Sequence, residues 1–370
     1  MIMPVTVHPI KKSEPSRMKA ASVRIGAIVL ALVASSLFIL LLKLNPIDVY
    51  VKMVQGAFGT AYRVRETIVK AIPLVITSLG IGIAFRMQFW NIGGEGQIAI
   101  GAFAATFFAL NMGDMPRPIL LLVMIIAGML AGGIWALIPA FFKAQWGTNE
   151  TIVTLMMNYI GIKWVTYLQY GPWRDPKSLG FPKIANFSDN AVLPELFGIH
   201  IGWLIALVLV AAVHIFMNHT KKGYEVAVIG ESINTARYAG INIKKTILIA
   251  IMLSGGLCGL VGMIQASAVN NTLSVEITGG VGYTAIITAW LAALSAPVIL
   301  IVSVLFAALL EGGSYIQTVF GIPQAAAEIL QGIILFFVLG SEFFVRYKFV
   351  FVKRNQSIDR HQVPAGKEVG

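Results

Sequence analysis

The sequence is poor in charged residues and nearly free of cysteine. Of its 370 residues only 12% are Asp, Glu, Lys or Arg, whereas an average soluble domain has about 25%. Hydrophobic types make up 57%, and the mean hydropathy is +0.79. This composition excludes water-soluble globular, disordered and collagen-like chains. It indicates a protein that faces lipid and crosses a membrane several times.

Residues that could support covalent, redox or metal chemistry are scarce. The single cysteine, Cys258, permits no internal disulfide and no CxxC pair, and we expect it to be a small apolar residue in a packed helix. The motifs G-x-x-x-x-G-K-[ST], G-x-S-x-G and H-E-x-x-H are all missing. We therefore expect no catalytic residue, no metal site and no cofactor bound by this chain.

The net charge is +11, from 28 Lys and Arg against 17 Asp and Glu. In a soluble protein such an excess would suggest nucleic acid. Here the basic residues lie mostly in tails and loops, where cations mark the cytoplasmic side of a membrane protein. We therefore expect membrane lipid, and no nucleic acid, among the partners.

A bilayer core requires about 20 apolar residues per helix. The sequence accordingly predicts an all-α polytopic membrane protein with about ten transmembrane segments. They lie near residues 25–42, 71–87, 96–110, 119–140, 149–169, 201–217, 246–266, 283–295, 297–312 and 327–346. The first segment follows five cations, as in a signal peptide, but its length and the segments after it favour a retained helix. Residues 1–24 and 347–370 are then tails, and 25–346 form the membrane domain.

Ten crossings place both termini on the same side. Eighteen Lys and Arg fall in the tails and loops of that side, against nine on the other. Because cations are kept in the cytoplasm, we expect both termini to be cytoplasmic in a multi-pass protein of the cell (plasma or inner) membrane. The segment 43–70, an expected outside loop, carries five of the nine. The proline-rich segment 171–200 is expected to fold as an extracytoplasmic cap.

Two of the segments, 96–110 and 283–295, are short, and each follows a glycine cluster. The clusters are Gly93, Gly94 and Gly96, and Gly279, Gly280 and Gly282. They occupy corresponding places in two halves of opposite direction, which predicts inverted repeats with glycine-broken segments. A helix broken within the membrane leaves N–H groups that only protein or a wet cavity can satisfy, so the breaks point to a transport path. The alternative is that the glycines allow close helix packing.

Several polar residues lie within or beside the apolar segments. Asn91, Glu95 and Gln97 cluster at the first break, and a polar group at this depth normally faces a cavity or a partner. Glu95 is therefore predicted to line the path or, alternatively, to be an acidic residue favoured at a helix N-terminus. Glu276 and Glu311, near later glycines, are candidate gate residues.

Five further residues are candidates for the path. Asn149 and Glu150 open the segment 149–169, where helix capping alone could explain them. Asn158 and Tyr159 lie deeper and could equally bond across helices or touch a solute. Trp290, in the second short segment, fits packing better than a stacking platform for a base.

The largest internal cytoplasmic loop, 218–245, contains a predicted short helix. Ser232 is a good N-cap and Gly240 a good C-terminal stop, so a helix of about 233–239 fits between them. Small apolar residues fall near one of its faces and could enter a groove on a partner. They are Ile233, Ala236 and Ala239. A solvated loop helix is the alternative, whereas an external motor would need such a helix to push.

Four segments, taken in order, carry a family resemblance. They are 91–97 (NIGGEGQ), 149–160 (NETIVTLMMNYI), 230–243 (GESINTARYAGINI) and 254–260 (SGGLCGL). With them, about 70–350 resembles the permease subunits of ABC importers, in the nucleoside and simple-sugar branch related to the ribose and branched-chain amino acid permeases. The stretch 282–293 departs from the family pattern at Trp290 and Ala293, which leaves the substrate open.

The resemblance implies a set of partners. The family works as two permeases, two ATPase domains that use ATP, and an extracytoplasmic binding protein. In the nucleoside branch the second permease is usually a different chain, and the ATPase is often a tandem fusion. The segment that docks on the ATPase corresponds to Gly230, Glu231, Ser232, Ala236, Arg237, Tyr238, Ala239 and Gly240.

The resemblance therefore implies a transport subunit, and no enzyme, that imports nucleosides by alternating access, with simple sugars as the nearest alternative. From the residues alone, an ion-coupled transporter that uses Glu95 or Glu150 as a proton site stays open. A polytopic membrane enzyme would require a catalytic constellation, which we do not find.

Overall fold

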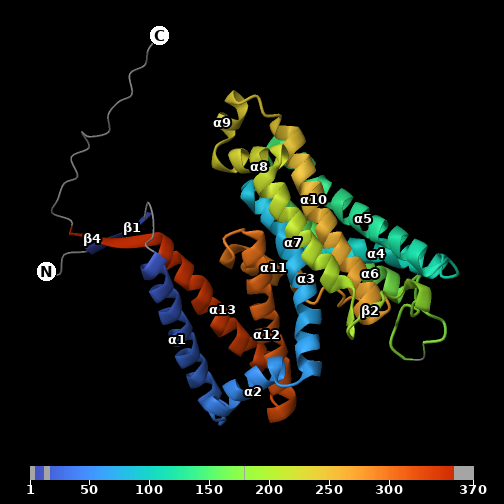
Figure 1. Cartoon of the computed structure of the whole chain (residues 1–370), viewed down its shortest axis with the longest axis horizontal. Coiled ribbons are helices and arrows are strands. Elements are labelled where there is room, and N and C mark those ends of the chain that lie inside the picture. The colour runs from blue at the N-terminus through green and yellow to red at the C-terminus, as the bar shows by residue number, and fades with distance from the viewer. Residues whose placement is uncertain (1–4, 12–16, 179, 354–370) are drawn as a thin grey trace. The chain divides into compact units, whose positions relative to one another are not determined.

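The described part of the chain is mostly helical in the computed structural model (Figure 1). The described residues are 5–11, 17–178 and 180–353. The chain divides into one unit of Met1–Pro46 with Glu328–Gly370 and a second unit of Ile47–Ala327, which we describe separately. Parts of the two predicted tails lie outside the described residues.

The first unit contains the elements from both ends of the chain. They are β1 (Val5–Lys11), α1 (Arg17–Leu41), most of α13 (Gln324–Arg346) and β4 (Tyr347–Lys353). β1 and β4 pair antiparallel, with Val5 opposite Lys353. Arg24 of α1 donates a hydrogen bond of 3.0 Å to Glu342 of α13, which ties the two helices together. Many apolar side chains of α1 are exposed, as expected of a helix that faces lipid.

The second unit holds the remaining elements. They are α2 (Pro46–Phe58), α3 (Ala61–Arg86), α4 (Gly94–Asn111), α5 (Arg117–Trp146), α6 (Glu150–Tyr170), η1 (Asp189–Ala191), β2 (Glu195–Leu196), β3 (Ile199–His200), α7 (Gly202–His219), α8 (Lys221–Glu231), α9 (Ile233–Tyr238), α10 (Ile243–Ile264), η2 (Gln265–Asn270), α11 (Val281–Leu291) and α12 (Ala296–Phe320). α3 and α10 cross the middle of this unit (Figure 1).

Local signals set several helix ends. The side chains of Thr60, Asn149 and Asn242 accept backbone N–H bonds at the starts of α3, α6 and α10, which satisfies donors that have no partner within the helix. Gly147 and Gly321 end α5 and α12 with φ of +64° and +62°, a conformation that glycine adopts without steric cost.

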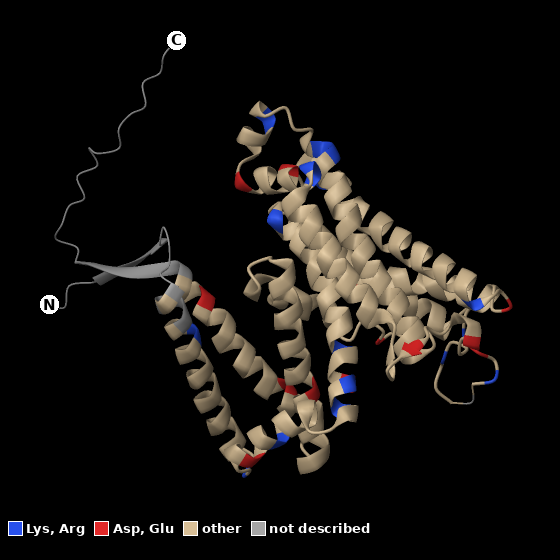
Figure 2. Ribbon diagram, viewed as in Figure 1, with Lys and Arg blue, Asp and Glu red and all other residues tan. Residues whose placement is uncertain are grey.

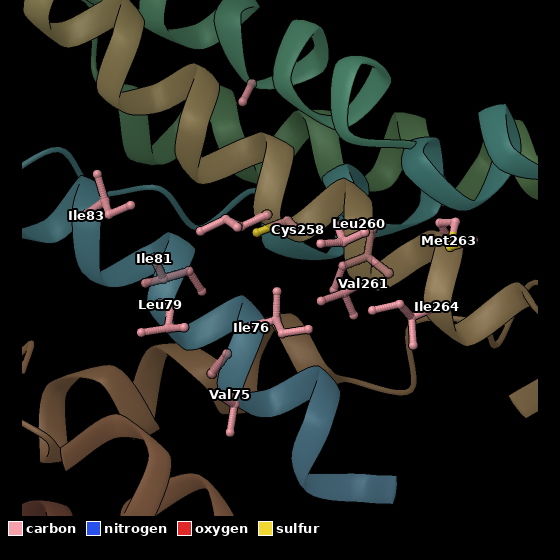
Figure 3. Packing of buried hydrophobic residues seen from close by; sticks show 14 of the residues in the cluster. Val75, Ile76, Leu79, Ile81, Ile83, Cys258, Leu260, Val261, Met263 and Ile264 are labelled. Carbon is pink, nitrogen blue, oxygen red and sulfur yellow. The ribbon is translucent and has the colours of Figure 1, made fainter. Parts of the chain in front are cut away.

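The core lies between α3 and α10. Figure 3 shows Ile76 of α3 extending toward Val261 and Ile264 of α10, and all three are nearly inaccessible to solvent. Cys258 is also buried here without a disulfide, as expected of a small apolar residue. On its other side α10 packs closely on α5 through small residues. The glycines at this contact are Gly128, Gly132, Gly255 and Gly259.

Seven helices among the described residues are long and apolar enough to cross a membrane. They are α1, α3, α5, α7, α10 with η2, α12 and α13. Each of the ten predicted segments coincides with a helix, but α4 and α6 are not apolar enough to qualify and α11 is too short. The chain is therefore a multi-pass membrane protein, whereas the count of ten crossings is not confirmed.

The prediction of a loop over 43–70 is wrong. α2 and the first turns of α3 occupy this segment, and an amphipathic helix such as α2 escapes a search for long apolar runs. Two of its cations bind Glu311 of α12: Arg63 lies 3.3 Å and Lys70 lies 2.7 Å from a carboxylate oxygen. Glu311, a candidate gate residue, thus joins α12 to α3 in a largely buried ion pair.

Two other predicted connections, 171–200 and 218–245, are also structured. The segment 171–200 folds onto η2: Ser267 donates to the Ala191 carbonyl, and Thr272 donates to the Ile184 carbonyl at 2.9 Å. Within 218–245, α8 precedes the predicted short helix. Thr246 of α10 holds α8 through a hydrogen bond of 2.7 Å to Glu225.

Candidate functional site

The two glycine-rich breaks meet inside the second unit. The backbone N–H of Gly282 donates a hydrogen bond of 2.6 Å to Oε1 of Glu95. A Cβ on Gly94 would lie only 3.3 Å from the Cα of Gly282. Gly280, with a φ of +76°, turns the chain into α11. The N-termini of α4 and α11, which are far apart in the sequence, therefore face each other.

This meeting has a chemical reason. The first N–H groups of a helix have no partner within it, and each helix N-terminus carries partial positive charge. Two such ends brought together inside a membrane protein require an acceptor. Glu95 supplies it and is only 2% exposed. The structure thus shows Glu95 at a helix N-terminus, as one of the two alternatives has it, and adds a bond to the opposite segment.

A pair of side-chain amides braces the first break. Asn91 and Gln97 exchange two hydrogen bonds, of 3.2 and 2.9 Å. Asn91 also donates to Oγ of Ser254 on α10 at 3.1 Å and accepts from the N–H of Gly93 at 3.0 Å. All three polar side chains are buried. The network fixes the non-helical backbone before α4 against α10.

Asn158 bonds across helices. Its Oδ1 accepts from the N–H of Gly96 and its Nδ2 donates to the carbonyl of Ile92, both at 2.8 Å. Thr154, one turn earlier on α6, accepts from the N–H of Ile92 at 3.3 Å. α6 therefore supports the backbone of the break. Tyr159, the next residue, is 57% exposed and is free of this network.

Two residues at the start of α6, Asn149 and Glu150, have different structural roles. Asn149 caps the helix by accepting from the N–H groups of Thr151 and Ile152, as the capping alternative predicts. Glu150 is buried and lies 2.7 Å from the ammonium nitrogen of Lys143 at the end of α5. Its other oxygen accepts from the N–H of Trp90 at 3.5 Å. Glu150 thus links α5, α6 and the break.

Three aromatic rings gather at the end of α3. Trp90 and Trp290 stack with centroids 5.6 Å apart and planes 21° apart, and Phe85 lies 5.2 and 5.8 Å from them. Trp290 is packed, as expected. Trp90 remains 41% exposed, and Phe85 is buried. Neither Phe85 nor Trp90 is among the predicted residues, although Trp90 directly precedes the motif that begins at Asn91.

A cavity of about 480 Å³ separates this cluster from the loop helices. One wall is formed by the break and the ion pair and the other by the end of α8 and the start of α9. The wall residues include Gln88, Trp90, Lys143, Glu150, Gly230, Ser232 and Asn234. Polar side chains from both walls thus line one cavity between the membrane helices and the loop.

The short helix in the loop exists as predicted. The side chain of Ser232 accepts from the N–H of Thr235 at 3.2 Å, and Gly240 ends the helix with a φ of +70°. The expectation about its apolar face is partly wrong, because Ala236 packs inward and is fully buried. Figure 1 shows α9 at one end of the second unit. The exposed residues on α9 and at its two ends include Glu231, Ile233, Arg237, Tyr238 and Ala239.

α8 connects this helix to the end of α3. Gly230 lies so close to the Arg86 carbonyl that a Cβ there would overlap the oxygen. Glu225 pairs with Lys222 and accepts from Thr246. These hydrogen bonds lower the pKa of Glu225 below its ordinary value, because they stabilise the carboxylate. α8 is therefore seated on α3 and α10 rather than loosely attached.

Among the described residues, no group of three His, Cys, Asp or Glu side chains could hold a metal ion. Cys258 is fully buried in the core. The site is thus built for holding helices and broken backbone together.

Comparison with known proteins places the chain among transport proteins. The family described as "Branched-chain amino acid transport system / permease component" matches residues 63–339. The glucose ABC transporter permease protein TsgB13 of Haloferax volcanii is 33% identical over 86% of this chain and 87% of its own length. The guanosine ABC transporter permease protein NupP of Bacillus subtilis is 30% identical, over 85% and 92%. The nucleoside ABC transporter permease protein NupB of Lactococcus lactis is 28% identical, over 84% and 88%.

Proposed function

The chain belongs to the family of branched-chain amino acid transport system permease components, and on that premise we propose that it imports nucleosides across the cell membrane. It is a permease subunit of an ABC importer and no enzyme. Membership of this family removes the two alternative functions considered from the sequence, an ion-coupled transporter and a membrane enzyme. ATP use then belongs to a partner ATPase.

One observation carries the proposed path: α4 and α11 begin against each other, joined by Glu95 and Gly282. Two short glycine-started helices in corresponding halves are the pattern of a central transport site between inverted repeats. Asn91, Gln97 and Asn158 shape this site by holding its backbone, because their polar atoms bond to the break. We propose that the transport path runs through the space next to the non-helical backbone that precedes α4.

Side chains that touch the solute must be accessible. Tyr159 is 57% exposed and Trp90 is 41% exposed, and Trp290 is partly exposed and stacked on Trp90. Aromatic faces of this kind bind bases by stacking, worth about 1–3 kcal/mol per base. Trp90, which Trp290 supports from one side, therefore favours a nucleoside over a plain sugar. Glu150, which follows Asn149 at the start of α6, lines the cavity beside Trp90.

The coupling to ATP is proposed to pass through α9. A partner ATPase that moves α9 also moves α8, and Gly230 transmits the displacement to Arg86 at the end of α3. The next groups along the chain are the aromatic cluster and the break. Tyr238, 93% exposed on α9, is the anchor proposed for the ATPase.

The remaining partners are proposed from the same motifs. They are a second permease that is a different chain, an ATPase in tandem-fused form and an extracytoplasmic binding protein. Both termini are proposed to be cytoplasmic, on the side of α9. Co-purification of the tagged chain with the products of its neighbouring genes, with protein mass spectrometry, identifies the partners. A chain that purifies alone and transports without ATP would overturn the assembly.

Uptake by the reconstituted assembly tests the substrate. Proteoliposomes with the binding protein outside and ATP inside are expected to accumulate labelled guanosine, and to stop when ATP is omitted. Labelled glucose is the matched alternative. Uptake of glucose alone would establish the sugar reading, and ATP-dependent uptake of neither would refute the proposal.

Substitution of Tyr238 tests the proposed coupling of the ATPase to α9. Tyr238→Ala is expected to weaken ATPase co-purification and uptake together. Tyr224→Ala, on α8, is the control because Tyr224 is also 65% exposed but lies outside α9. Equal effects of the two substitutions would contradict the assignment of α9.

A further inference from the structure

An apolar groove lies on the second unit and shares no lining residue with the cavity beside the break. It has a volume of about 390 Å³ and is lined by side chains of α3, α5, α7 and α10. The lining includes Met129, Leu130, Ala212, Phe216, Met252 and Leu253. Leu130, Ala212, Met252 and Leu253 are exposed, so the groove is open to the surroundings of the protein.

The groove runs toward lysines at the end of the unit that carries α8 and α9. On α10, Lys245 precedes the groove residue Ile249 by four positions, so both lie on one face of the helix. On the other side, Lys221 follows α7 just beyond Phe216. The hydrogen bond between Thr246 and α8 holds the starts of α8 and α10 together. Figure 2 shows basic residues at this place.

The charges at this end leave two cations available. Lys222 pairs with Glu225, the acidic residue of α8 that faces α10. Lys244 donates to the side-chain oxygen of Gln145 on α5 at 2.8 Å. Lys221 and Lys245 are exposed, and neither has an ion pair among the described residues. The end of the unit one turn beyond the groove on α10 is therefore positively charged, although Lys221 also interacts electrostatically with Glu225.

The dimensions of the groove fit a lipid chain. Twelve residues separate Lys245 from Leu257 at the inner end of the groove, or about 18 Å along a helix, close to half of a 30 Å bilayer core. A groove of this length and apolar lining suits a thin, flexible hydrocarbon chain.

We propose that this groove binds one acyl chain of an anionic phospholipid, whose phosphate group contacts Lys221 and Lys245. Juxtamembrane lysines attract anionic headgroups by about 1 kcal/mol each. The apolar lining gives the acyl chain a binding surface outside the proposed transport path. The site is independent of what the protein transports.

Photolabelling with a defined lipid tests the proposal. The assembly is purified with its partners in detergent and is labelled with phosphatidylglycerol that carries a diazirine in its acyl chain, and the labelled peptides are mapped by mass spectrometry. The label is expected on α7 and α10 at the groove. Unlabelled phosphatidylglycerol is expected to compete at least five times better than phosphatidylcholine. Label spread evenly over all lipid-facing helices would overturn the proposal.

Two pairs of variants sharpen the test. Ala212→Trp fills the groove, whereas Ala211→Trp adds the same bulk at an exposed neighbour that does not line it. Only the first is expected to abolish groove labelling. Lys221→Gln with Lys245→Gln is expected to remove the preference for the anionic lipid. Lys177→Gln with Lys183→Gln, both exposed in the segment 171–200, is expected to preserve it.

Three outcomes would contradict the proposal. Equal competition by the two lipids would refute the headgroup contact and with it the proposal. Unchanged labelling of Ala212→Trp would refute the groove as the site. Loss of the second permease from the Ala212→Trp assembly, with no label in the wild-type groove, would show a protein interface there instead.

Discussion

The contact between the two breaks supports a quantitative prediction. Glu95→Ala removes the acceptor for the Gly282 N–H, which lies within 2.6 Å of it in a buried place. An unpaired buried donor costs about 1–3 kcal/mol. We therefore expect the free energy of unfolding of the assembly to fall by about 1–3 kcal/mol, and ATP-driven uptake to fall further because the breaks separate.

The matched variant is Glu95→Gln. An amide oxygen can still accept from the Gly282 N–H, although hydrogen bonds to ionised groups are roughly twice as strong as neutral ones. Glu95→Gln should therefore lie between wild type and Glu95→Ala in stability. Glu276→Ala, an exposed carboxyl on the approach to α11, serves as the control and should leave stability unchanged.

Thermal unfolding of the purified assembly and uptake into proteoliposomes provide the two measurements. If Glu95→Ala is as stable as wild type and Glu276→Ala, the bond does not hold the breaks together. If Glu95→Ala is less stable but transports normally, the meeting of the breaks is structural and the proposed path is wrong.

The other predictions concern the loop, the ion pair and a buried histidine. Gly240→Val forces a branched residue into a φ of +70°, so uptake should fall while membrane insertion, measured in isolated membranes, persists. Lys143→Ala leaves the largely buried Glu150 without its cation and should destabilise the assembly by about 1–2 kcal/mol in denaturation, because Lys143 is itself partly solvated. Burial lowers the pKa of His200 from 6.5 to about 4. Between pH 6.5 and about pH 4 the unfolded chain therefore binds more protons than the folded protein. The free energy of unfolding falls as the pH drops through this range. The loss should reach about 2 kcal/mol between pH 7 and pH 5 and should vanish in His200→Leu when unfolding is measured at both values.

Local sequence was sufficient wherever the cause of a structure was itself local. Ser232 and Gly240 predict α9 correctly because a cap and a left-handed stop act within a few residues. The capping role of Asn149 follows for the same reason. Long apolar runs predict the membrane helices because the bilayer demands them whatever the neighbours. By contrast, α2 and α8 were missed, since helices outside the apolar core do not need such runs.

The sequence by itself determined that the chain is a membrane protein, that two of its segments begin at glycines and that a capped helix lies between its halves. Only the tertiary structure decided which groups meet. Glu95 finds Gly282, and Glu311 finds Arg63 and Lys70 across long stretches of chain. Such partners depend on how helices pack, because buried polar groups must be satisfied by whatever the fold brings near them. Composition and motif spacing therefore do not predict these contacts between distant residues.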